Sequence, residues 1–395
     1  MVSKKSHTVF ISALEVSAEN LAIDLINSNS SETVEFSLAA IGSKRLEQQG
    51  AKLIADNTSM NIMGLTQLIP SAKKIISTLR LAARYFKTQK PDLVILIDSS
   101  GFNLKLAKIA KQNGCKVLYY VSPQIWASRF KRIKKIQRYV DHMAVLYPFE
   151  QAIYQQNNVS ASYVGHPVAL KIDQLLRQMT REDKEEKENS KLIALLPGSR
   201  TQEIKKLLPV MVKTITILKK KYPNSRFILP VAHANCKALI TKTITSDIEL
   251  IESDTLKALA RADCAICTSG TATLELALLG VPHVVVYKTS SLNYAIAKKI
   301  LTTDYISLPN ILSGQKIIPE LLQSDVTPER VFKNLQPMIN NPRYSGLIKK
   351  SFDQLRHEMT DVSNITSLTR IIDTLLAENE TSSEQKLSNS ELETT

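Results

Sequence analysis

The 395-residue sequence lacks the signatures of several common classes of protein. None of its eleven glycines forms a G-x-G pair or has the spacing of a Walker A loop, which excludes a dinucleotide fingerprint and a P-loop. No uncharged apolar run approaches the roughly 18 residues that a membrane-spanning helix needs. The basic and then apolar start of the chain is interrupted by Glu15 and has no small-residue cleavage site. It therefore predicts a first core strand and not a signal peptide.

Cysteine is scarce, and its spacing excludes the usual metal sites. The four cysteines lie in apolar surroundings, which predicts buried free thiols in a reducing cytoplasm. Cys264 and Cys267 form a single C-x-x-C, with no second pair and no nearby His. This pair predicts a buried strand and not a zinc site.

Acidic residues are almost absent from one long segment. Between Asn57 and Val140 there are sixteen Lys and Arg but only two acids, Asp92 and Asp98, so this segment carries the whole net charge of +14. Such asymmetry favours an anionic partner for the N-terminal half. A nucleic acid, a membrane surface and an anion-binding pocket each fit this charge, and a solvated basic face without a partner is the alternative.

Short apolar runs alternate with segments of helical period, which is typical of parallel sheets with helices on both faces. The expected strands lie at 8–14, 36–42, 92–98, 116–122, 142–148, 192–198, 226–232, 262–270 and 282–288. We expect an α/β fold of two doubly wound, Rossmann-like domains that face a cleft. The expected parts are an N-terminal domain at 1–170, a charged linker or exposed hairpin at 171–191, a second domain at 192–350, helices at 351–376 and a disordered tail at 377–395.

Two strand-to-helix turns of the second domain contain the residue types of a phosphate site. In "LLPGSRTQE", Gly198 permits close backbone approach, Ser199 can cap or donate, and Arg200 offers a bidentate fork. In "CTSGTATLE", hydroxyl groups and backbone N–H groups crowd a helix N-terminus, and Glu275 can accept from ribose hydroxyls. Helix capping explains either turn alone, but two such turns in one domain favour a nucleotide diphosphate site.

Polar residues also follow two strands of the N-terminal domain. Asp98 ends an apolar strand, where a carboxylate either caps the next helix or acts as a general base. Glu15 and Ser17 follow the first strand and are expected on the same side of the domain.

Several blocks of the sequence together resemble the lipid-A-disaccharide synthase family of GT-B glycosyltransferases. They include "NIMGLTQLIP", "YVSPQIWASRFKRIKKI", "YVGHP", "LLPGSR", "SGTATLELALLGVP" and "DYISLPNILSG", in the order and spacing of the family over roughly residues 8–375. The resemblance implies an inverting enzyme that joins UDP-2,3-diacylglucosamine to 2,3-diacylglucosamine-1-phosphate (lipid X). The products would be a β-1,6 disaccharide 1-phosphate and UDP, in the lipid A pathway of Gram-negative bacteria. Neither a metal nor a cofactor is implied, because helix ends and cations can stabilise the leaving diphosphate.

The resemblance also assigns roles to residues. Asp98 becomes the candidate base for the 6-hydroxyl of the acceptor, with Glu15 and Ser17 in the same catalytic group. The donor UDP side comprises Ser199, Arg200, Glu203, Ser269, Gly270, Thr271, Thr273, Glu275 and Asn310. The acceptor and lipid side comprises Asn103, Ser122, Trp126 and Arg129.

The acceptor side departs from the family pattern at two places. Leu14 and Ala18 replace the glycines of "GE-x-SGD", while Ser100 and Gly101 replace the Pro and Asp of "D-x-PDFN". A paralogue with an altered acceptor or weak catalysis, which still binds UDP-sugar and membrane lipid, is therefore an alternative. Two other readings are a different GT-B enzyme (an epimerase or an undecaprenyl-linked N-acetylglucosaminyl transferase) and a nucleic-acid-binding protein.

The segment 61–87 has the pattern of an interfacial helix. Its expected membrane contacts are Leu68, Ile69, Lys73, Lys74, Ile75, Ile76 and Leu79. This combination of an apolar stripe and cations predicts a peripheral element on the anionic cytoplasmic face of the inner membrane, and the cations at 129–138 extend it. Simple covering of the sheet by this stripe is the alternative. The resemblance allows a homodimer, although no residue demands one.

Overall fold

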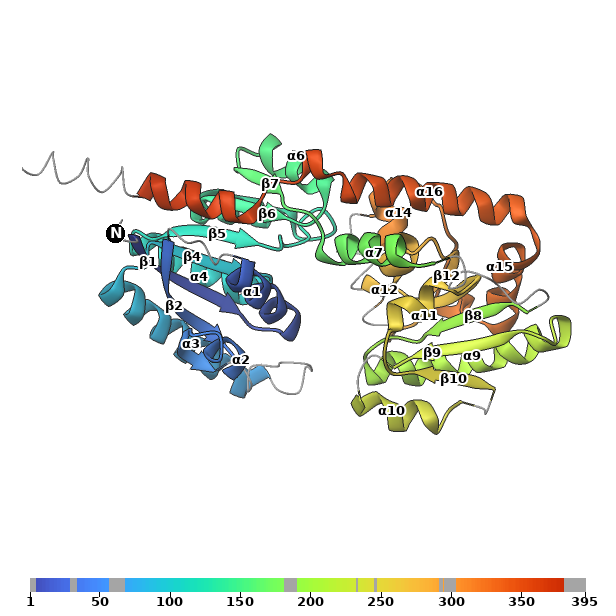
Figure 1. Ribbon diagram of the computed structural model, residues 1–395. Coiled ribbons are helices and arrows are strands. Elements are labelled where there is room, and N and C mark those ends of the chain that lie inside the picture. Colours follow the sequence, from blue (N-terminus) through green and yellow to red (C-terminus); the bar gives the residue numbers. More distant parts are fainter. Residues whose placement is uncertain are drawn as a thin grey trace, which may run out of the picture. The chain divides into compact units, whose positions relative to one another are not determined.

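The computed structural model describes residues 5–28, 34–56, 68–180, 190–231, 234–244, 247–290, 294 and 303–379. The chain forms two compact units, one of residues 1–165 with 362–395 and one of residues 166–361 (Figure 1). It therefore passes between the units twice, after Gly165 and after Asp361. The expected division placed the first boundary at 170 and kept the C-terminal helices together, whereas here they are shared between the units. Residues 181–189 of the expected linker and 380–395 of the expected tail lie outside the described residues.

The N-terminal unit is built on a seven-stranded sheet in the order β3-β2-β1-β4-β5-β6-β7, and every pairing is parallel. Its strands are β1 (Lys5–Ala13), β2 (Val34–Gly42), β3 (Lys52–Asp56), β4 (Leu93–Ile97), β5 (Lys116–Tyr120), β6 (His142–Val145) and β7 (Ala161–Tyr163). The direction of winding reverses between β1 and β4, which is the position where ligands bind in doubly wound sheets.

Helices cover both faces of this sheet because successive strand residues point to opposite faces. Phe10 and Val94 belong to one buried cluster with residues of the helices that follow β3, β4 and β5, while Ile11 and Ile95 belong to the cluster on the other face. The helices are α1 (Val16–Ser28), α2 (Lys44–Glu47), α3 (Leu68–Gln89), α4 (Ser100–Gln112), η2 (Phe130–Arg132), α5 (Ile133–Tyr139), α6 (Pro148–Gln156) and η4 (Val362–Asn364).

The second unit repeats the same winding with a six-stranded sheet in the order β10-β9-β8-β11-β12-β13. Its strands are β8 (Leu192–Leu196), β9 (Arg226–Pro230), β10 (Ile248–Ile251), β11 (Cys264–Thr268), β12 (His283–Tyr287) and β13 (Glu320–Leu322). Its helices are α7 (Pro167–Gln178), α9 (Thr201–Lys221), α10 (Ala234–Thr241), α11 (Thr255–Ala260), α12 (Thr271–Leu278), α14 (Leu308–Ser313), η3 (Gln323–Asp325), α15 (Pro328–Asn340) and α16 (Pro342–Thr360). Here the winding reverses between β8 and β11, so each unit has one switch point.

The last described helix, residues 368–379, completes the core of the N-terminal unit (red in Figure 1). Ile371, Ile372, Leu375 and Leu376 are each at most 5% exposed and belong to the same cluster as β1 and β4. The Lys116 Nζ lies 2.9 Å from a carboxylate oxygen of Glu378 at the end of this helix. The sheet is thus covered on this face by residues from both ends of the chain.

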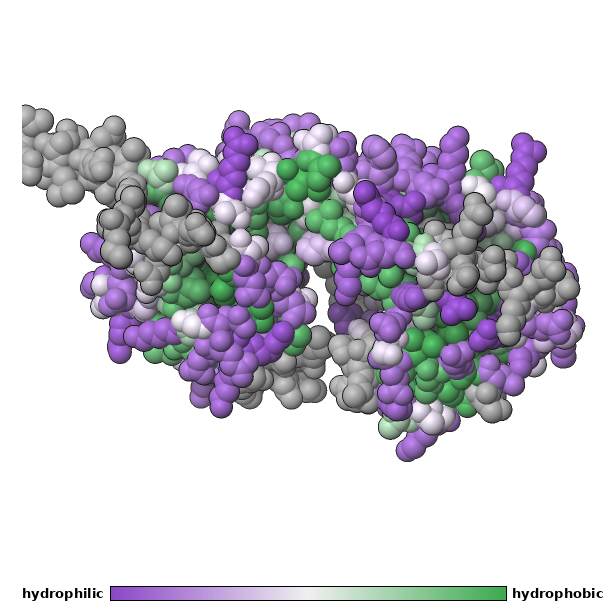
Figure 2. Space-filling model, viewed as in Figure 1, coloured by the Kyte–Doolittle hydropathy of each residue, from purple (hydrophilic) through white to green (hydrophobic). Residues whose placement is uncertain are grey.

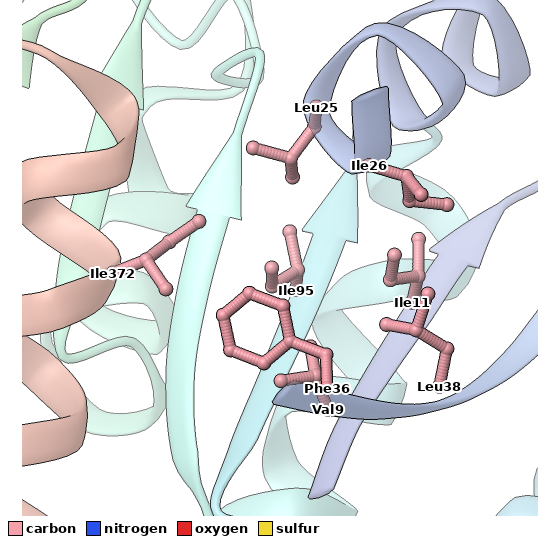
Figure 3. A pocket seen from close by; sticks show the side chains of 8 residues that line it. All are labelled: Val9, Ile11, Leu25, Ile26, Phe36, Leu38, Ile95 and Ile372. Carbon is pink, nitrogen blue, oxygen red and sulfur yellow. The ribbon is translucent and has the colours of Figure 1, made fainter. Parts of the chain in front are cut away.

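An apolar groove lies on the same face, over the middle of β1, β2 and β4 (Figures 2 and 3). It is lined by Val9, Ile11, Leu25, Ile26, Phe36, Leu38, Ile95 and Ile372. Because these residues lie along the strands and not at their carboxyl ends, the groove is separate from the polar loops described below.

The structure also bears on the cysteines and on membrane-spanning helices. All four cysteines are buried and free, which confirms that part of the prediction. Within the described ranges, no helix combines the length and the apolar character that crossing a membrane requires.

Candidate active site

The predicted catalytic residues lie at the switch point of the N-terminal unit. Ala13, the last residue of β1, is the register partner of Ile97, the last residue of β4. Glu15 and Ser17 follow β1 directly and Asp98 follows β4, so the fold brings both loops to adjacent strand ends. Glu15 and Ser17 are exposed at this edge.

Asp98 occupies a strained turn. Its φ is +51° and that of Ser99 is +44°, a left-handed region that non-glycine residues seldom adopt. Its backbone N–H donates to the carbonyl oxygen of Tyr120 at 3.0 Å. Burial raises the pKa of the Asp98 carboxyl above its ordinary value, partly offset by a hydrogen bond from the backbone of Ser99. Strained, partly buried acids of this kind are concentrated at functional sites.

A buried amide holds this turn in place. Asn103 Nδ2 donates to the carbonyl oxygens of Ile97 at 3.0 Å and Asp98 at 2.9 Å, and Asn103 Oδ1 accepts from Ser12 Oγ at 2.8 Å. The Tyr119 hydroxyl also donates to the Asp98 carbonyl, at 2.6 Å. Asn103 has no exposed surface. The sequence predicted that Asn103 contacts the acceptor directly. Its buried, engaged amide is better suited to supporting the Asp98 turn.

The loop after β5 is fixed by a carboxylate that the sequence reading missed. Glu150 on α6 is 2% exposed, and its Oε1 accepts from Ser122 Oγ at 2.7 Å and from Trp126 Nε1 at 2.9 Å. Burial raises the pKa of Glu150 to about 7, although its hydrogen bonds oppose the shift. Ser122 and Trp126 thus face into the protein at this point, whereas Arg129 is exposed.

The same loop reaches back to the Asp98 turn. Arg132, a half-buried residue at the end of η2, donates from NH1 to Ser100 Oγ at 2.7 Å. Ser100 is the first residue of α4 and lies two positions after Asp98. Arg132 is also close enough to oppose the raised pKa of Tyr119. The sequence showed the basic run, but local pattern could not indicate that Arg132 would bond to the residue two positions after Asp98.

The predicted phosphate turns lie at the switch point of the second unit. Leu196, at the end of β8, pairs with Cys267 near the end of β11. Gly198 has a φ of +106°, and a Cβ there would lie 2.4 Å from Glu203 Oε2 and 3.1 Å from Thr268 Cγ2. Only glycine allows this contact between the two turns. Exposed Arg200 forms an ion pair with Glu203 at 3.1 Å, and Ser199 is exposed beside it.

The turn after β11 presents hydroxyl groups and backbone at the start of α12. Ser269 Oγ donates to the Ile306 carbonyl at 2.7 Å, and buried Thr273 Oγ1 donates to the Gly270 carbonyl at 2.8 Å. The first bond ties the turn to the loop before α14 and the second is internal to the turn. Both hydroxyl groups are thus engaged, and Gly270 and Thr271 form the exposed part of the turn. Thr268, which the sequence reading passed over, is 5% exposed, and its Oγ1 has no hydrogen-bond partner among the described residues.

Glu275 lies one turn into α12. It is half-buried, and burial raises the pKa of its carboxyl while Lys171 of α7 opposes the shift. No hydrogen bond or ion pair to this carboxylate is found within the described part of the chain. Glu275 is therefore placed to accept from a ligand.

Asn310 of α14 is buried and fully hydrogen-bonded. Its Nδ2 donates to the Ile318 carbonyl and to Glu320 Oε1, both at 2.9 Å. Its Oδ1 accepts from the backbone N–H groups of Ile317 at 2.8 Å and Ile318 at 3.0 Å. Since each polar atom already has two partners or more, Asn310 is suited to shaping the 306–320 loop and less suited to binding UDP.

The predicted membrane helix is described in part. The side chains of Leu68 and Ile69 lie outside the described residues. Ile75 and Leu79 pack against the core. These two residues therefore cover the sheet, which was the alternative to membrane contact. Ile76 is 48% exposed, Lys73 is exposed and Lys74 is half-buried.

The two doubly wound units, each with polar loops at its switch point, define the GT-B class of glycosyltransferases and related epimerases. Solved structures of this fold include UDP-GlcNAc 2-epimerase from Neisseria meningitidis bound to UDP-GlcNAc, with a TM-score of 0.57 and 16% identity over 94% of this chain and 100% of that chain. The glycotransferase of kitacinnamycin has a TM-score of 0.61 and 13% identity over 94% of this chain and 99% of that chain. These likenesses confirm the predicted fold class.

The chain belongs to the lipid-A-disaccharide synthetase family, whose model matches residues 9–369. The lipid-A-disaccharide synthase of Coxiella burnetii (strain CbuG_Q212) is 38% identical over 381 residues, which cover 95% of this chain and all of that protein. The synthase of Syntrophus aciditrophicus (strain SB) is 37% identical over 362 residues, 90% of this chain and 94% of that protein. The family resemblance is thereby confirmed, and the other GT-B enzymes are set aside.

Proposed function

We propose that this chain joins UDP-2,3-diacylglucosamine to lipid X, inverts the anomeric centre and releases UDP. The observation that supports this most directly is the half-buried, strained Asp98 at the switch point of the N-terminal unit. In a single displacement the attacking 6-hydroxyl must lose its proton, and a carboxylate of raised pKa is a suitable acceptor for it. Exposed Glu15 and Ser17, on the adjacent strand end, are assigned to hold hydroxyl or amide groups of the acceptor sugar.

The test is UDP release from UDP-2,3-diacylglucosamine in mixed micelles, with and without lipid X. Release that depends on lipid X is the expected result. Tight binding of UDP-sugar without release would instead favour a paralogue with an altered acceptor. The placement of the two residues that replace the family glycines weighs against that alternative: Leu14 packs against the core and Ala18 is 1% exposed. Neither side chain therefore covers the exposed Glu15 and Ser17.

On the donor side, we assign the diphosphate of UDP to the turns that follow β8 and β11. Negative charge develops there as the sugar leaves, and the N-terminus of α12 and the Arg200 guanidinium both favour it. The buried Thr268 hydroxyl, which has no partner among the residues described, can donate to a phosphate oxygen. The carboxylate of Glu275 is assigned to the ribose hydroxyls.

Exchange of Glu275 for Gln is expected to raise the KM for the UDP-sugar by about tenfold or more. Hydrogen bonds to a charged group contribute roughly 1.5–3 kcal/mol, and the amide would lose that charge. Initial rates at saturating lipid X measure the effect. Glu249→Gln, an exposed site on β10, is the matched control and should leave this KM unchanged. A KM for the donor that stays constant in Glu275→Gln would remove Glu275 from the nucleotide site.

We also assign the face formed by α3, α4 and α5 to an anionic membrane surface. These three helices carry no acidic residue. Their exposed cations are Lys73, Arg80, Arg84, Lys87, Lys105, Lys108, Lys134, Lys135 and Arg138. Ile76 and Leu81 of α3, and Phe130 of η2 just before α5, are each at least 45% exposed. Cations around exposed apolar side chains suit the headgroup region of a lipid bilayer. The acylated substrates of the proposed reaction reside in such a bilayer.

Reversal of charge on α3 is expected to weaken binding to anionic vesicles by about tenfold or more, since each cation near such a surface contributes about 1 kcal/mol. The variant is Lys73→Glu with Lys74→Glu, and vesicle flotation at two salt concentrations is the measurement. Lys220→Glu with Lys221→Glu, on α9, makes the same change of charge in the other unit as a control. Undiminished flotation would contradict the assignment. Salt-sensitive binding to RNA without lipid would favour a nucleic-acid partner instead.

A further inference from the structure

Glu150 is a buried acid that the proposed reaction does not use. It is the third helical residue of α6, and its Oε2 accepts from the backbone N–H of Tyr147 at 3.3 Å, which is ordinary capping of its own helix. Its other oxygen, Oε1, is engaged by Ser122 and Trp126 of the loop after β5. Capping requires only one of the two oxygens. The hydrogen bonds that Oε1 accepts from Ser122 and Trp126 therefore join α6 to the loop.

The loop that is hydrogen-bonded to Glu150, residues 121–128, has an unusual backbone. Val121 begins it with a φ of +66°, which is costly for a β-branched residue, and Arg129 ends it with a φ of +58°. Between these points Ile125 is 1% exposed and the Tyr154 hydroxyl donates to the Pro123 carbonyl at 3.2 Å. A loop strained at both ends keeps its shape only if its middle is held firmly.

This loop determines where two cations lie. Exposed Arg129 and half-buried Arg132 follow it directly, and Arg132 contacts Ser100 beside the Asp98 turn. A chain of contacts therefore runs from Glu150 through Trp126 and the loop to Arg132, and ends two residues from Asp98. Lipid X carries a phosphate, and guanidinium groups bind phosphate through paired N–H donors.

We propose that Glu150 is a positioning residue for the acceptor: its carboxylate fixes the 121–128 loop so that Arg129 and Arg132 receive the acceptor phosphate. This proposal rests on the proposed function. It assigns Arg132, which the sequence did not single out, to the acceptor side, and it gives Ser122 and Trp126 the role of holding the loop and not of touching substrate.

The decisive variant is Glu150→Gln, which keeps the volume of the side chain. If the amide oxygen caps Tyr147, its NH₂ group faces the Trp126 N–H, and two donors cannot bond to each other. The KM for lipid X should rise about tenfold or more, with the KM for the UDP-sugar and kcat each within about threefold. Initial rates with each substrate varied in mixed micelles give these constants.

Three comparisons separate positioning from simple support of the fold. A destabilised protein loses active molecules, which lowers apparent kcat but leaves the KM for lipid X unchanged. Ile11→Val, a buried change in β1, is the control for this. Trp126→Phe removes the same N–H donor, so combining it with Glu150→Gln should add little to either single effect. Because the charge on buried Glu150 is costly, Glu150→Gln should unfold at a temperature no lower than wild type above pH 7.

The pH dependence offers a further readout. Wild-type KM for lipid X should rise as pH falls through about 7, where Glu150 gains a proton. In Glu150→Gln the rise should be smaller and should begin only nearer pH ~6, where the acceptor phosphate itself gains a proton. Tyr147 and Tyr154 are the other titratable groups that interact with Glu150, and burial raises the pKa of both hydroxyls, so neither ionises in this range. An unchanged KM for lipid X in Glu150→Gln would overturn the proposal. Wild-type protein without release of UDP that depends on lipid X would instead contradict the proposed function.

Discussion

Exchange of Asp98 for Asn is expected to lower UDP release that depends on lipid X by about a hundredfold or more, since a general base contributes roughly 10²–10⁴ to the rate. The substitution isolates the proton-accepting role. Asn tolerates the left-handed conformation better than most residues, so the turn at φ +51° should survive, with its carbonyl still held by Asn103 and Tyr119. The loss should therefore fall on kcat and not on the KM for either substrate.

The matched control is Asp92→Asn, the same change just before the opposite end of β4. Asp92 is half-exposed, and its carboxylate accepts from the Thr8 N–H at 2.9 Å, a bond that an amide oxygen can replace. This variant should keep UDP release within about threefold of wild type. Asp98→Asn activity in the same range would remove Asp98 from the role of base and leave the transferase itself intact.

The pH profile of kcat provides an independent check on Asp98. The base acts only when deprotonated, and burial raises the pKa of this carboxyl. Wild-type kcat should therefore fall, as pH decreases, at a higher pH than an ordinary Asp would cause. In Asp98→Asn that descending limb should be absent.

Ending the chain after Asp361 is expected to unfold the N-terminal unit and leave the second unit folded. The missing helix supplies Ile371, Ile372, Leu375 and Leu376 to the core. Loss of one buried Leu or Ile side chain typically costs about 2–5 kcal/mol, whereas a whole domain has a stability of only about 5–15 kcal/mol. Removal of four such residues therefore exceeds what the unit can lose.

Limited proteolysis with mass spectrometry, together with thermal unfolding followed by circular dichroism, tests this result. In the shortened chain, fragments from 1–165 should be cut rapidly and 166–361 should resist. A chain ended after Asn379 keeps the helix and should unfold like the full-length protein. Protection of 1–165 in the shorter chain would show that the C-terminal helix is dispensable for this unit.

The sequence predicted the inner strands of both sheets but not their edge strands. Each of the nine expected strands corresponds to an observed one, whereas β3, β7, β10 and β13 were not expected. These four are the edge strands of the two sheets. An inner strand is covered on both faces and paired on both sides, which requires a continuous apolar run. An edge strand such as β13 is half-exposed throughout, so its sequence need not be apolar.

The positions of the candidate site residues in the fold were predicted best where a strand ends and a helix begins. Asp98, Arg200 and Gly270 follow from that local pattern, because parallel strands present their carboxyl ends at one edge. The role proposed for Glu150 depends on its hydrogen bond with Trp126, 24 positions away in the chain, and that of Asn103 on its hydrogen bond with Ser12, 91 positions away. Local pattern carries no information about such pairings, so these residues emerge only from the folded arrangement.

The return of the chain to the N-terminal unit has a consequence for biosynthesis. A ribosome makes residues 1–165 first, yet the face of their sheet over β1 and β4 is covered only in part, by α1 and α2, until residues 368–379 emerge. The second unit, continuous from 166 to 361, has all of its residues earlier. Folding should therefore finish in the reverse of the order of synthesis, and a prematurely terminated chain would carry a folded second unit beside an incomplete N-terminal unit.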